Sequence, residues 1–575
     1  MNKKYLYSIP DFIKENIGDR AAVFVFPTDI VAQSWAEWAV TGGHTGVKSV
    51  ALDRFIAWDQ FKGSFMSADK KGAMAVPSLL RKMFVYDLIQ KNSENAFLSK
   101  IIKPEYASSA FSFAGWLEKN LPSLHLWKKR MDDNRSTYGQ LDDEDRDYQK
   151  VYELYSQFLE ENALFEPSWI EKVEFSDSSR KFYILYPEQL ADFSNFDEIF
   201  ANAPNVTALL MPEDVPGPEL YFYKDARREL RQTMLRIIAL VKEGKADWTE
   251  IALSVPDLDL YRPYIRREFK QYGIPYVFRA GISLTRNNAG RIFREISDCH
   301  ASGFAYDDLR TLLLDETIPW KKTVSLNMKE AGGPDKYENF DLKELKEDLI
   351  REGNRMRCIC PYEQQDENGI WSSVDIWEEA LGKTYAVNKV LLKFYRKLKN
   401  DVNRFFSSEN VSFASIRDAW FNFKEHFIDD SDYTSFADKI LSRCITHLEE
   451  LIELEQTYST AGLKVSSPFQ FYLELLDSKK YTLQAEERGV SVVPYKVTAG
   501  AYFKYQFVID GSQKNLEVPY KPLSFLNAEK RRKLKLSEED TLYNATGTII
   551  RLYAKPSEGV PENFVHFSAS EESFS

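Results

Sequence analysis

Residues 21–40 read AAVFVFPTDIVAQSWAEWAV, and this stretch decides the fold class. Its first part, 21–28, is a continuous apolar run that ends at Pro27 and Thr28, which is typical of a buried strand in a parallel sheet. In the second part apolar residues recur at helical spacing, and Thr28 or Asp29 can cap the start of the helix. The stretch therefore predicts a strand followed by a helix, the opening of a strand–helix–strand unit in an α/β protein.

The next stretch, TGGHTGVKSVAL at 41–52, predicts a turn and then a second strand over 47–52. It misses the phosphate-binding pattern G-x-x-x-x-G-K-[ST] by one residue, because Val47 stands where the second glycine should be. A working phosphate loop follows a strand and opens a helix, whereas this stretch follows a helix. We interpret its glycines as turn residues with positive φ, namely Gly42, Gly43 and Gly46. An active P-loop NTPase that uses Lys48 is kept as an alternative.

Composition limits the class of protein. A length of 575 residues predicts about three to five units, and no apolar run of about 18 residues is present to span a membrane. The N-terminus lacks the apolar core of a signal peptide, and four cysteines are too few for a disulfide framework. We therefore expect a cytoplasmic protein without membrane contact or a bound metal. The net charge of −12 argues against a uniformly basic nucleic-acid coat, but it allows a locally basic groove.

The strand–helix pattern recurs along the chain and is interrupted by helical stretches. Apolar runs at 182–186 and 206–211 continue the first α/β unit, and the proline-rich segment 212–220 separates it from a second one. Residues 301–485 are mostly helical in pattern, with a polar part at 320–370 that predicts loops. The sequence thus predicts two α/β units, each interrupted by a helical insert.

Several phrases, taken in their order, carry a family resemblance. They are VFVFPTDIVAQSWAEW, KVYELYSQFLEE, KFYILYPEQLADFSNFDEIF, EIALSVPDLDLYRPYIRREFKQYGIPYVF and GAYFKYQFVIDGSQKNLEVPYKP. The chain resembles the superfamily 1, UvrD-like helicase subunit of bacterial helicase–nuclease complexes, the B subunit of AddAB or RexAB. The resemblance implies an α/β fold of two RecA-like parallel-sheet domains, each with a large helical insertion.

The resemblance also implies domain boundaries. They are 1–60 with 181–215 for the first RecA-like domain, 61–180 for its helical insertion, 216–300 with 486–556 for the second RecA-like domain, 301–485 for its helical insertion, and 557–575 for a tail towards a missing nuclease domain. The tail is inferred from HFSASEESFS at the end of the chain, which resembles the start of such a nuclease domain. An iron–sulfur cluster and exonuclease activity would belong to that domain, and no cofactor is expected in this chain. Either the chain is a fragment or it naturally lacks the nuclease.

The motifs that such helicases use for ATP hydrolysis are degenerate here. The phosphate-loop position is held by Pro27, Thr28 and Asp29, without a lysine, and Glu188 is a lone carboxylate that we expect in solvent. Residues 494–502 keep only Gly500 of their motif, and Thr548 stands at the arginine position of another. ATP hydrolysis needs a phosphate cradle, a metal carboxylate and a cation for the developing charge. We therefore expect no catalytic or nucleotide-binding residue, and we interpret the chain as an inactivated helicase fold.

In such complexes the inactive subunit pairs with an active AddA-like or RexA-like motor and binds or scans single-stranded DNA at a duplex end during double-strand break repair and recombination. Single-strand binding needs cations together with aromatic faces. Two stretches, LYRPYIRREFKQY and EKRRKLKL, fit this requirement, although each can also be a plain helix whose cations face water. The DNA-binding candidates are Tyr261, Arg262, Arg266, Arg267, Lys270, Arg531 and Arg532. A structural adaptor that never touches DNA is a further alternative.

Overall fold

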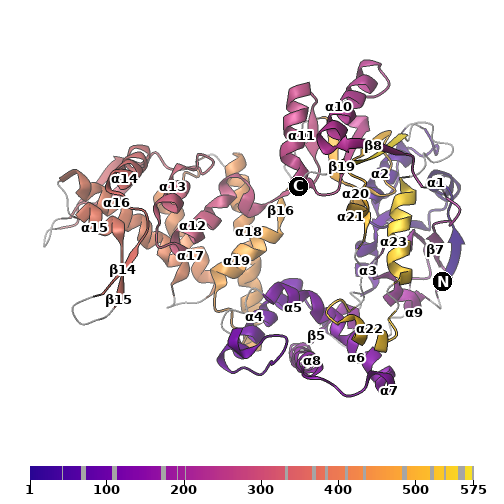
Figure 1. The fold of residues 1–575 in the computed structure, drawn as a ribbon, viewed down its shortest axis with the longest axis horizontal. Helices are drawn as coiled ribbons and strands as arrows, with labels where there is room; N and C mark the ends of the chain where they lie inside the picture. Colours follow the sequence, from indigo (N-terminus) through magenta and orange to yellow (C-terminus); the bar gives the residue numbers. More distant parts are fainter. Residues whose placement is uncertain are drawn as a thin grey trace.

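The structure is a computed structural model. It describes residues 1–41, 43–66, 73–106, 113–169, 177–190, 192–200, 203–215, 217–329, 334–365, 371–382, 386–407, 412–431, 435–481, 488–518, 523–536, 539–553 and 564–572. These residues form two parallel β-sheets with flanking helices and two helical blocks (Figure 1). The α/β class with two parallel sheets, expected from the sequence, is confirmed.

The first lobe contains a parallel sheet with the strand order β1-β7-β6-β2-β3. Its elements are β1 (Asn2–Tyr5), α1 (Ile9–Asn16), β2 (Ala22–Phe26), α2 (Asp29–Val40), β3 (Phe55–Ala57), α3 (Trp58–Met66), β6 (Lys181–Leu185), α9 (Asp197–Phe200) and β7 (Val206–Leu210). The run AVFVF forms β2, which is buried at every position. Phe24 and Phe26 pack with α1 and α2 on one face, while Val23 and Val25 pack with α3 on the other. A strand covered on both faces reads as a continuous apolar run, which is why the sequence revealed it.

The strand predicted over 47–52 is wrong. The chain forms a short 3₁₀ turn at Leu52–Arg54 and joins the sheet only at β3. Arg54 at the end of this turn donates from its guanidinium to the carbonyl oxygens of Ala22 at 2.9 Å and Ile17 at 3.0 Å, which ties the turn to the start of β2. In the turn before it, Gly43 and Gly46 have the expected positive φ of 69° and 70°, whereas Gly42 lies outside the described residues.

The first helical block follows β3 and precedes β6. Its elements are β4 (Met74–Ala75), α4 (Ser78–Glu94), α5 (Ala114–Asn120), α6 (Leu124–Asp133), α7 (Arg135–Tyr138), α8 (Asp143–Glu161) and β5 (Leu164–Phe165). A capping box of Asp142 and Asp145 begins α8. The stripe of Tyr148, Val151 and Tyr155 that the helical period predicts is buried.

The second lobe contains a parallel sheet with the strand order β10-β17-β9-β18-β19-β8. Its elements are β8 (Leu220–Asp225), α10 (Ala226–Lys242), β9 (Ile251–Val255), α11 (Leu258–Tyr272), β10 (Tyr276–Phe278), β17 (Val490–Pro494), α20 (Tyr495–Thr498), β18 (Tyr505–Val508), α21 (Gln513–Leu516), α22 (Ala528–Lys533), α23 (Glu539–Leu552) and β19 (Phe564–Glu572).

The expectation that 557–575 forms a tail leading out of the second lobe is wrong for β19. This strand lies inside the second sheet and pairs in parallel with β18 on one side and β8 on the other. The sequence concealed this strand because its buried run is not a continuous apolar one: the buried residues His566, Ser568 and Ser570 are polar. Ser568, for example, is fully buried, and its hydroxyl donates to a Glu229 carboxylate oxygen at 2.5 Å.

The second helical block is inserted between β10 and β17. Its elements are β11 (Ile282–Ser283), α12 (Ile292–Ala301), α13 (Tyr306–Leu314), β12 (Thr323–Asn327), β13 (Tyr337–Asp341), α14 (Leu342–Met356), β14 (Tyr362–Gln365), β15 (Trp371–Val374), α15 (Ile376–Gly382), α16 (Ala386–Asn403), α17 (Phe413–Phe427), α18 (Phe436–Thr457), α19 (Pro468–Ser478) and β16 (Lys480–Tyr481). The loops expected over 320–370 are in part wrong, because β12–β13 and β14–β15 are hairpins flanking α14. In β12, Val324 and Leu326 are buried and the residue between them is exposed, which is the alternation of a strand. The strand is only five residues long and lies in a polar segment, so the sequence did not reveal this alternation.

The four parts are arranged as a ring (Figure 1). The two helical blocks meet where Glu474 binds Lys82 at 3.0 Å and accepts a hydrogen bond from the Tyr86 hydroxyl at 2.5 Å. On the other side, the segment 523–536 of the second lobe docks on the first helical block, where Leu523, Leu526 and Leu534 join the core. Lys530 in this segment is only 10% exposed and lies 2.8–2.9 Å from three carboxylates, which belong to Asp142, Glu144 and Asp145.

Three further features bear on function. No helix in the described ranges is both long enough and apolar enough to cross a bilayer. The four cysteines are unpaired. Within the described part of the chain, no three His, Cys, Asp or Glu side chains are grouped so that they could hold a metal ion.

The Lys530 cluster yields a prediction about stability. Lys530→Ala leaves three neighbouring carboxylates without their cation, and we expect a loss of about 3 kcal/mol at this contact. Hydrogen exchange should then accelerate in α22 and at the start of α8, and thermal unfolding should begin at a lower temperature. The control is Lys533→Ala, because Lys533 is 40% exposed and pairs only with Glu529. Equal effects of the two substitutions would contradict the structural role of Lys530.

His566 in β19 yields a prediction about pH. Its ring is fully buried against Tyr221 at 4.2 Å, and burial together with Arg236 lowers its pKa from 6.5 to about 4. Between pH 6.5 and 4 the unfolded chain therefore binds a proton at this histidine, whereas the folded chain does not. The free energy of unfolding is highest above pH 6.5, and it falls by up to roughly 3 kcal/mol as the pH drops from 6.5 to 4. His566→Phe should reduce this acid sensitivity in thermal unfolding at pH 5 and 7.5. His44→Phe, at an exposed position, should leave it unchanged.

Candidate nucleic-acid interface

The start of α2, where a phosphate loop would lie, contacts the second lobe directly. The Thr28 hydroxyl donates to the Val497 carbonyl oxygen at 2.7 Å, and its oxygen also caps α2. Two turns further along α2, the Trp35 indole N–H donates to the Gly500 carbonyl oxygen at 2.7 Å. The Tyr502 N–H donates to the Ser34 hydroxyl at 3.0 Å. We call these three hydrogen bonds the interlobe contact, and they join the lobes beside the helix end at which a triphosphate would bind.

The other degenerate motifs are uncharged or buried. Gly500 has a φ of 82°, so its retention is explained by backbone conformation. Thr548 is 2% exposed inside α23 and brings no cation to the lobe boundary. The expectation that Glu188 lies in solvent is wrong. Its carboxylate accepts a hydrogen bond from the Met211 N–H at 2.8 Å, and burial raises its pKa.

A small pocket of about 260 Å³ remains between the lobes near the interlobe contact. Among the described residues that line it, Arg551 is the only Lys or Arg, and the carboxylate of Asp11 also faces it. One cation opposed by one carboxylate does not match the charge of a nucleoside triphosphate with its metal. This pocket therefore does not restore the missing phosphate site.

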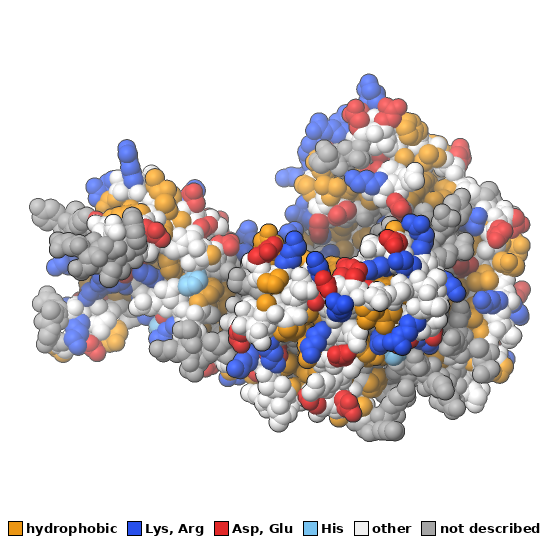
Figure 2. Space-filling model, turned by 60° about the horizontal axis from the view of Figure 1, so that its bottom comes forward, with side chains coloured by type: hydrophobic (Ala, Val, Ile, Leu, Met, Phe, Trp, Pro, Cys, Tyr) orange, Lys and Arg blue, Asp and Glu red, His pale blue; other side chains and the backbone are white. Residues whose placement is uncertain are grey.

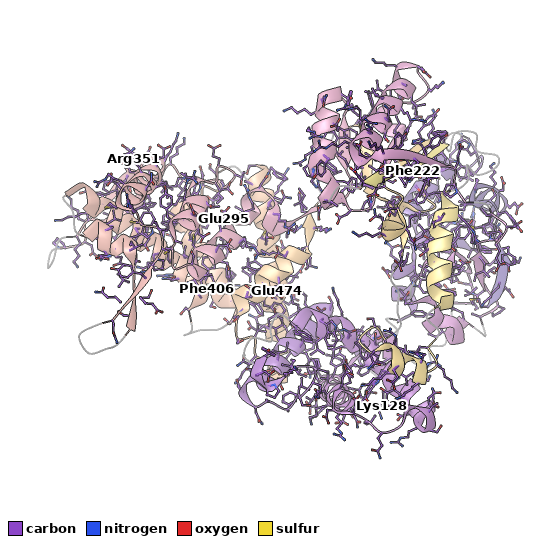
Figure 3. All side chains as sticks on the ribbon, in the orientation of Figure 1. Lys128, Phe222, Glu295, Arg351, Phe406 and Glu474 are labelled. Carbon is purple, nitrogen blue, oxygen red and sulfur yellow. The ribbon has the colours of Figure 1, made fainter. Side chains whose placement is uncertain are left out.

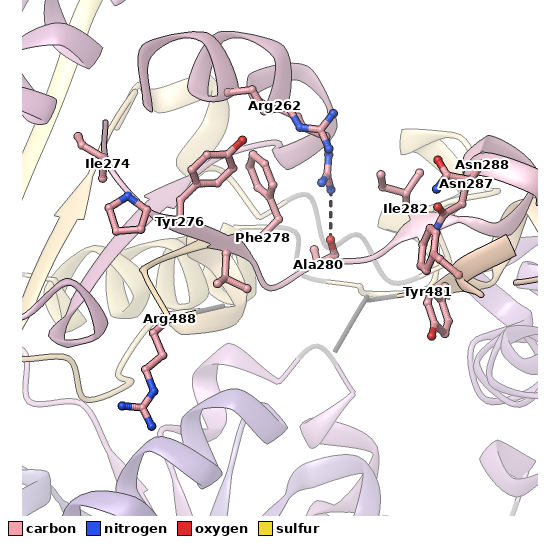
Figure 4. A pocket seen from close by; sticks show the side chains of 14 residues that line it. Arg262, Ile274, Tyr276, Phe278, Ala280, Ile282, Asn287, Asn288, Tyr481 and Arg488 are labelled. Atoms are coloured by element: carbon pink, nitrogen blue, oxygen red, sulfur yellow. Dashed lines mark hydrogen bonds between the residues drawn. The ribbon is translucent and has the colours of Figure 1, made fainter. Parts of the chain in front are cut away.

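A larger groove of about 720 Å³ lies where the second sheet meets the second helical block (Figure 4). It is lined by β10, by the face of α11 above it, and by β11 and β16, which lead into and out of the block. Its charged and aromatic lining consists of Arg262, Arg266, Arg488, Tyr276, Phe278, Phe436 and Tyr481. We call this site the arginine groove.

The sequence places the arginines of α11 on one side of the helix. Arg262 and Arg266 are four residues apart, so they project from the same face, towards β10. The guanidinium of Arg262 lies 4.4 Å from the centre of the Phe278 ring and donates to the Ala280 carbonyl oxygen at 3.1 Å (Figure 4). Arg266 lies 5.8 Å from the same ring and is exposed. Arg262 thus positions the groove wall, while Arg266 is available to a ligand.

Edge strand β10 contributes the aromatic surface. Tyr276 and Phe278 are two residues apart and therefore share one face of the strand. Their ring centres are 5.2 Å apart, and both side chains are half-buried. Tyr481 faces them from β16 across the groove (Figure 4). Partly open aromatic faces beside cations are the combination that single-stranded nucleic acids require.

The charge of the groove is unusual for this chain. None of the described lining residues is Asp or Glu, although the chain as a whole carries a net charge of −12. Asp259 at the start of α11 approaches Arg262 at 3.9 Å from outside the groove and neutralises it only in part. On the face shown in Figure 2, blue and red side chains are interspersed over much of the surface. The arginine groove is therefore a local site for an anion.

Two of the predicted DNA-binding residues are structural. Tyr261 is 1% exposed and its hydroxyl donates to the Asp510 carboxylate, so its ring cannot stack on a base. Arg531 is 7% exposed and donates to the Leu526 carbonyl oxygen at 2.9 Å in the segment that docks on the first helical block. Both predictions are wrong because the helical period by itself did not show which side of each helix faces the core.

The other candidates lie in three places. Arg262 and Arg266 line the arginine groove. Arg267 and Lys270 are exposed on α11 outside it, and Arg267 pairs with Glu268 at 2.9 Å. Arg532 is exposed on α22, far across the ring from α11 (Figure 1). DNA binding by these residues stays a prediction.

The sequence analysis missed Tyr276, Phe278, Tyr481 and Arg488. Tyr276 and Phe278 carried a usable signal, since aromatic residues at alternate positions of a strand form one face. Tyr481 and Arg488 carried none, because they are about 200 residues away from α11 along the chain and only the return from the second helical block brings them to the groove.

Comparisons with known proteins agree with a divided chain. Residues 9–210 match the family described as the Treponema TP0900 N-terminal P-loop domain. Residues 285–329 and 336–482 match the Treponema TP0900 fourth helical domain. The chain is 26% identical to an uncharacterized protein of Treponema pallidum (strain Nichols) over 607 aligned positions, which cover 96% of this chain and 70% of the relative. The first lobe and its helical block thus resemble a P-loop domain, although Pro27, Thr28 and Asp29 stand at the loop.

The interlobe contact yields a prediction about nucleotides. We expect no change in the thermal unfolding midpoint on addition of ATP and Mg²⁺, for the wild type or for Lys48→Ala, because Lys48 is exposed on a turn away from any helix start. A nucleotide at 100 times its Kd would stabilise the protein by about 2.7 kcal/mol. A rise in the midpoint that Lys48→Ala removes would establish the NTPase alternative instead.

Proposed function

We propose that this protein is a non-motor, helicase-like subunit that holds single-stranded DNA in the arginine groove, beside an active motor subunit of a bacterial helicase–nuclease complex. The observation that carries the proposal is a groove with three arginines, four aromatic side chains and no carboxylate among its described lining residues. Cations fit the phosphates of a strand and aromatic rings fit its unstacked bases, which a duplex does not expose.

The non-motor part of the proposal rests on the interlobe contact. A motor of this type changes the distance between its lobes when it binds and hydrolyses ATP, and charged groups at the boundary stabilise the transferring phosphoryl group. Here the boundary is occupied by three direct hydrogen bonds, and Thr28 and Thr548 supply no charge. Such a pair of lobes supports a fixed scaffold.

The biological setting follows from the family resemblance of the ordered phrases. A fixed scaffold that binds a single strand suits the end processing of DNA double-strand breaks, in which a second, active subunit of the AddA or RexA kind supplies unwinding. Location in the cytoplasm and the absence of a resident cofactor in this chain are part of the same proposal. A C-terminal nuclease domain with an iron–sulfur cluster belongs to it only as a feature of a longer parent protein.

The arginine groove gives the test. The double variant Arg266→Ala and Arg488→Ala should bind a short oligodeoxythymidine about tenfold more weakly than the wild type. The slope of log Kd against log salt concentration should fall by about 1.4, since each lost phosphate contact on a single strand removes about 0.7. Fluorescence anisotropy over a salt series measures both quantities on the full chain.

The matched control is Arg532→Ala, which removes an exposed arginine far from the groove. We expect it to bind the oligonucleotide with the affinity and the salt slope of the wild type. If the wild-type protein shows no salt-dependent binding to single strands, the proposal is wrong and the structural adaptor is favoured. Equal losses in the control and the groove variant would show that the groove is not the site.

A further inference from the structure

The outward face of α10 carries five cations and no exposed carboxylate. Five basic side chains of this 17-residue helix are exposed or flank the exposed face: Arg227, Arg228, Arg231, Arg236 and Lys242. The helix contains one carboxylate, Glu229, and that residue is 1% exposed. Glu229 faces the sheet, where it accepts hydrogen bonds from the Asp510 N–H at 2.9 Å and from Ser568. The charge of Glu229 is therefore directed away from the surface.

Most of these cations are not neutralised by neighbours. Arg228 pairs with Asp225, the cap of α10, at 3.4 Å, and Arg236 lies 5.0 Å from the centre of the Tyr221 ring. Arg227, Arg231 and Lys242 make no ion pair with any residue in the described ranges. A row of unpaired cations on a protein of net charge −12 produces a local positive potential that attracts a polyanion.

This face continues from the arginine groove. α10 packs beside α11, since Leu230, Met234 and Ile237 of α10 share a core with the buried side of α11. The two helices lie next to each other on the second lobe (Figure 1), and in Figure 3 the outward side chains of this lobe project freely into solvent. Arg266 of the groove is followed on α11 by exposed Arg267 and Lys270. Exposed cations thus run from the groove across α11 to α10.

We propose that the outward face of α10 is a second binding surface for the phosphate backbone of DNA, which extends the path of the strand held in the arginine groove. This inference rests on the proposed function, and it lengthens the segment of single-stranded DNA that the protein contacts. The helix is about 25 Å long, so its cations can meet several successive phosphates. Leu235 and Ala239 are the exposed apolar side chains of this helix, and so small an apolar area suits a charged backbone better than the apolar core of a protein interface.

The test compares two lengths of oligodeoxythymidine, of about six nucleotides for the groove alone and about 25 nucleotides for the whole path. The double variant Arg227→Gln and Arg231→Gln should bind the short strand as the wild type does. On the long strand its affinity should fall about tenfold, and its salt slope should fall by about 1.4. The matched control is Lys245→Gln, because Lys245 lies just beyond α10 and is already paired with Glu243 at 2.7 Å.

The outcomes separate the two proposals. If the α10 variant keeps the wild-type affinity and slope on the long strand while the groove variant weakens both strands, the extended path is wrong and the proposed function stands. If the wild type binds neither strand, the proposed function fails and this inference fails with it. If poly-glutamate displaces the long strand as effectively as unlabelled DNA, the face recognises any acidic polymer, and its assignment to a nucleic-acid backbone is overturned.

Discussion

The hydrogen bond between Thr28 and Val497, with its two neighbours from Ser34 and Trp35, is the constraint on which the arrangement of the lobes depends. It occurs at the N-terminus of α2, where the backbone N–H groups and the helix dipole would otherwise attract a phosphate. The Thr28 hydroxyl accepts from one of these N–H groups, that of Val31, and donates to the Val497 carbonyl oxygen, so a contact within the protein uses part of this helix end. The lobes keep their α/β architecture and are joined directly beside this helix end, next to the small pocket that remains between them.

A boundary that is joined by direct hydrogen bonds changes what the second lobe can be used for. In a motor, residues 494–502 and the part of α23 around Thr548 would respond to the nucleotide, whereas here Gly500 is retained for its backbone conformation and Thr548 is buried without charge. The exposed chemistry of the lobe is instead at the edge strand β10 and on the outer sides of α10 and α11. Edge strands and outward helix faces are free to vary without disturbing the sheet, which explains how a cationic, aromatic surface can exist on an acidic chain.

The ring is held by polar contacts that differ in burial. Lys530 with its three carboxylates and the contact of Glu474 with Lys82 and Tyr86 fasten the first helical block on both sides. Each joins segments that are more than 300 residues apart, so each fixes the relative position of whole parts rather than of neighbouring helices. The arginine groove benefits from this rigidity, because its walls come from β10 and from the two strands that lead into and out of the second helical block.

The sequence by itself determined the α/β class and the first strand and helix, because a strand covered on both faces must be apolar throughout and a helix start needs a capping side chain. It also determined that the phosphate loop is degenerate, since Pro27, Thr28 and Asp29 can be read without coordinates. Only the tertiary structure decided that β19 enters the sheet, that Tyr261 and Arg531 are buried, and that Tyr481 and Arg488 reach the groove. The physical reason is that local patterns record which side of an element is apolar, whereas the neighbours that an element meets are set by contacts between residues hundreds of positions apart.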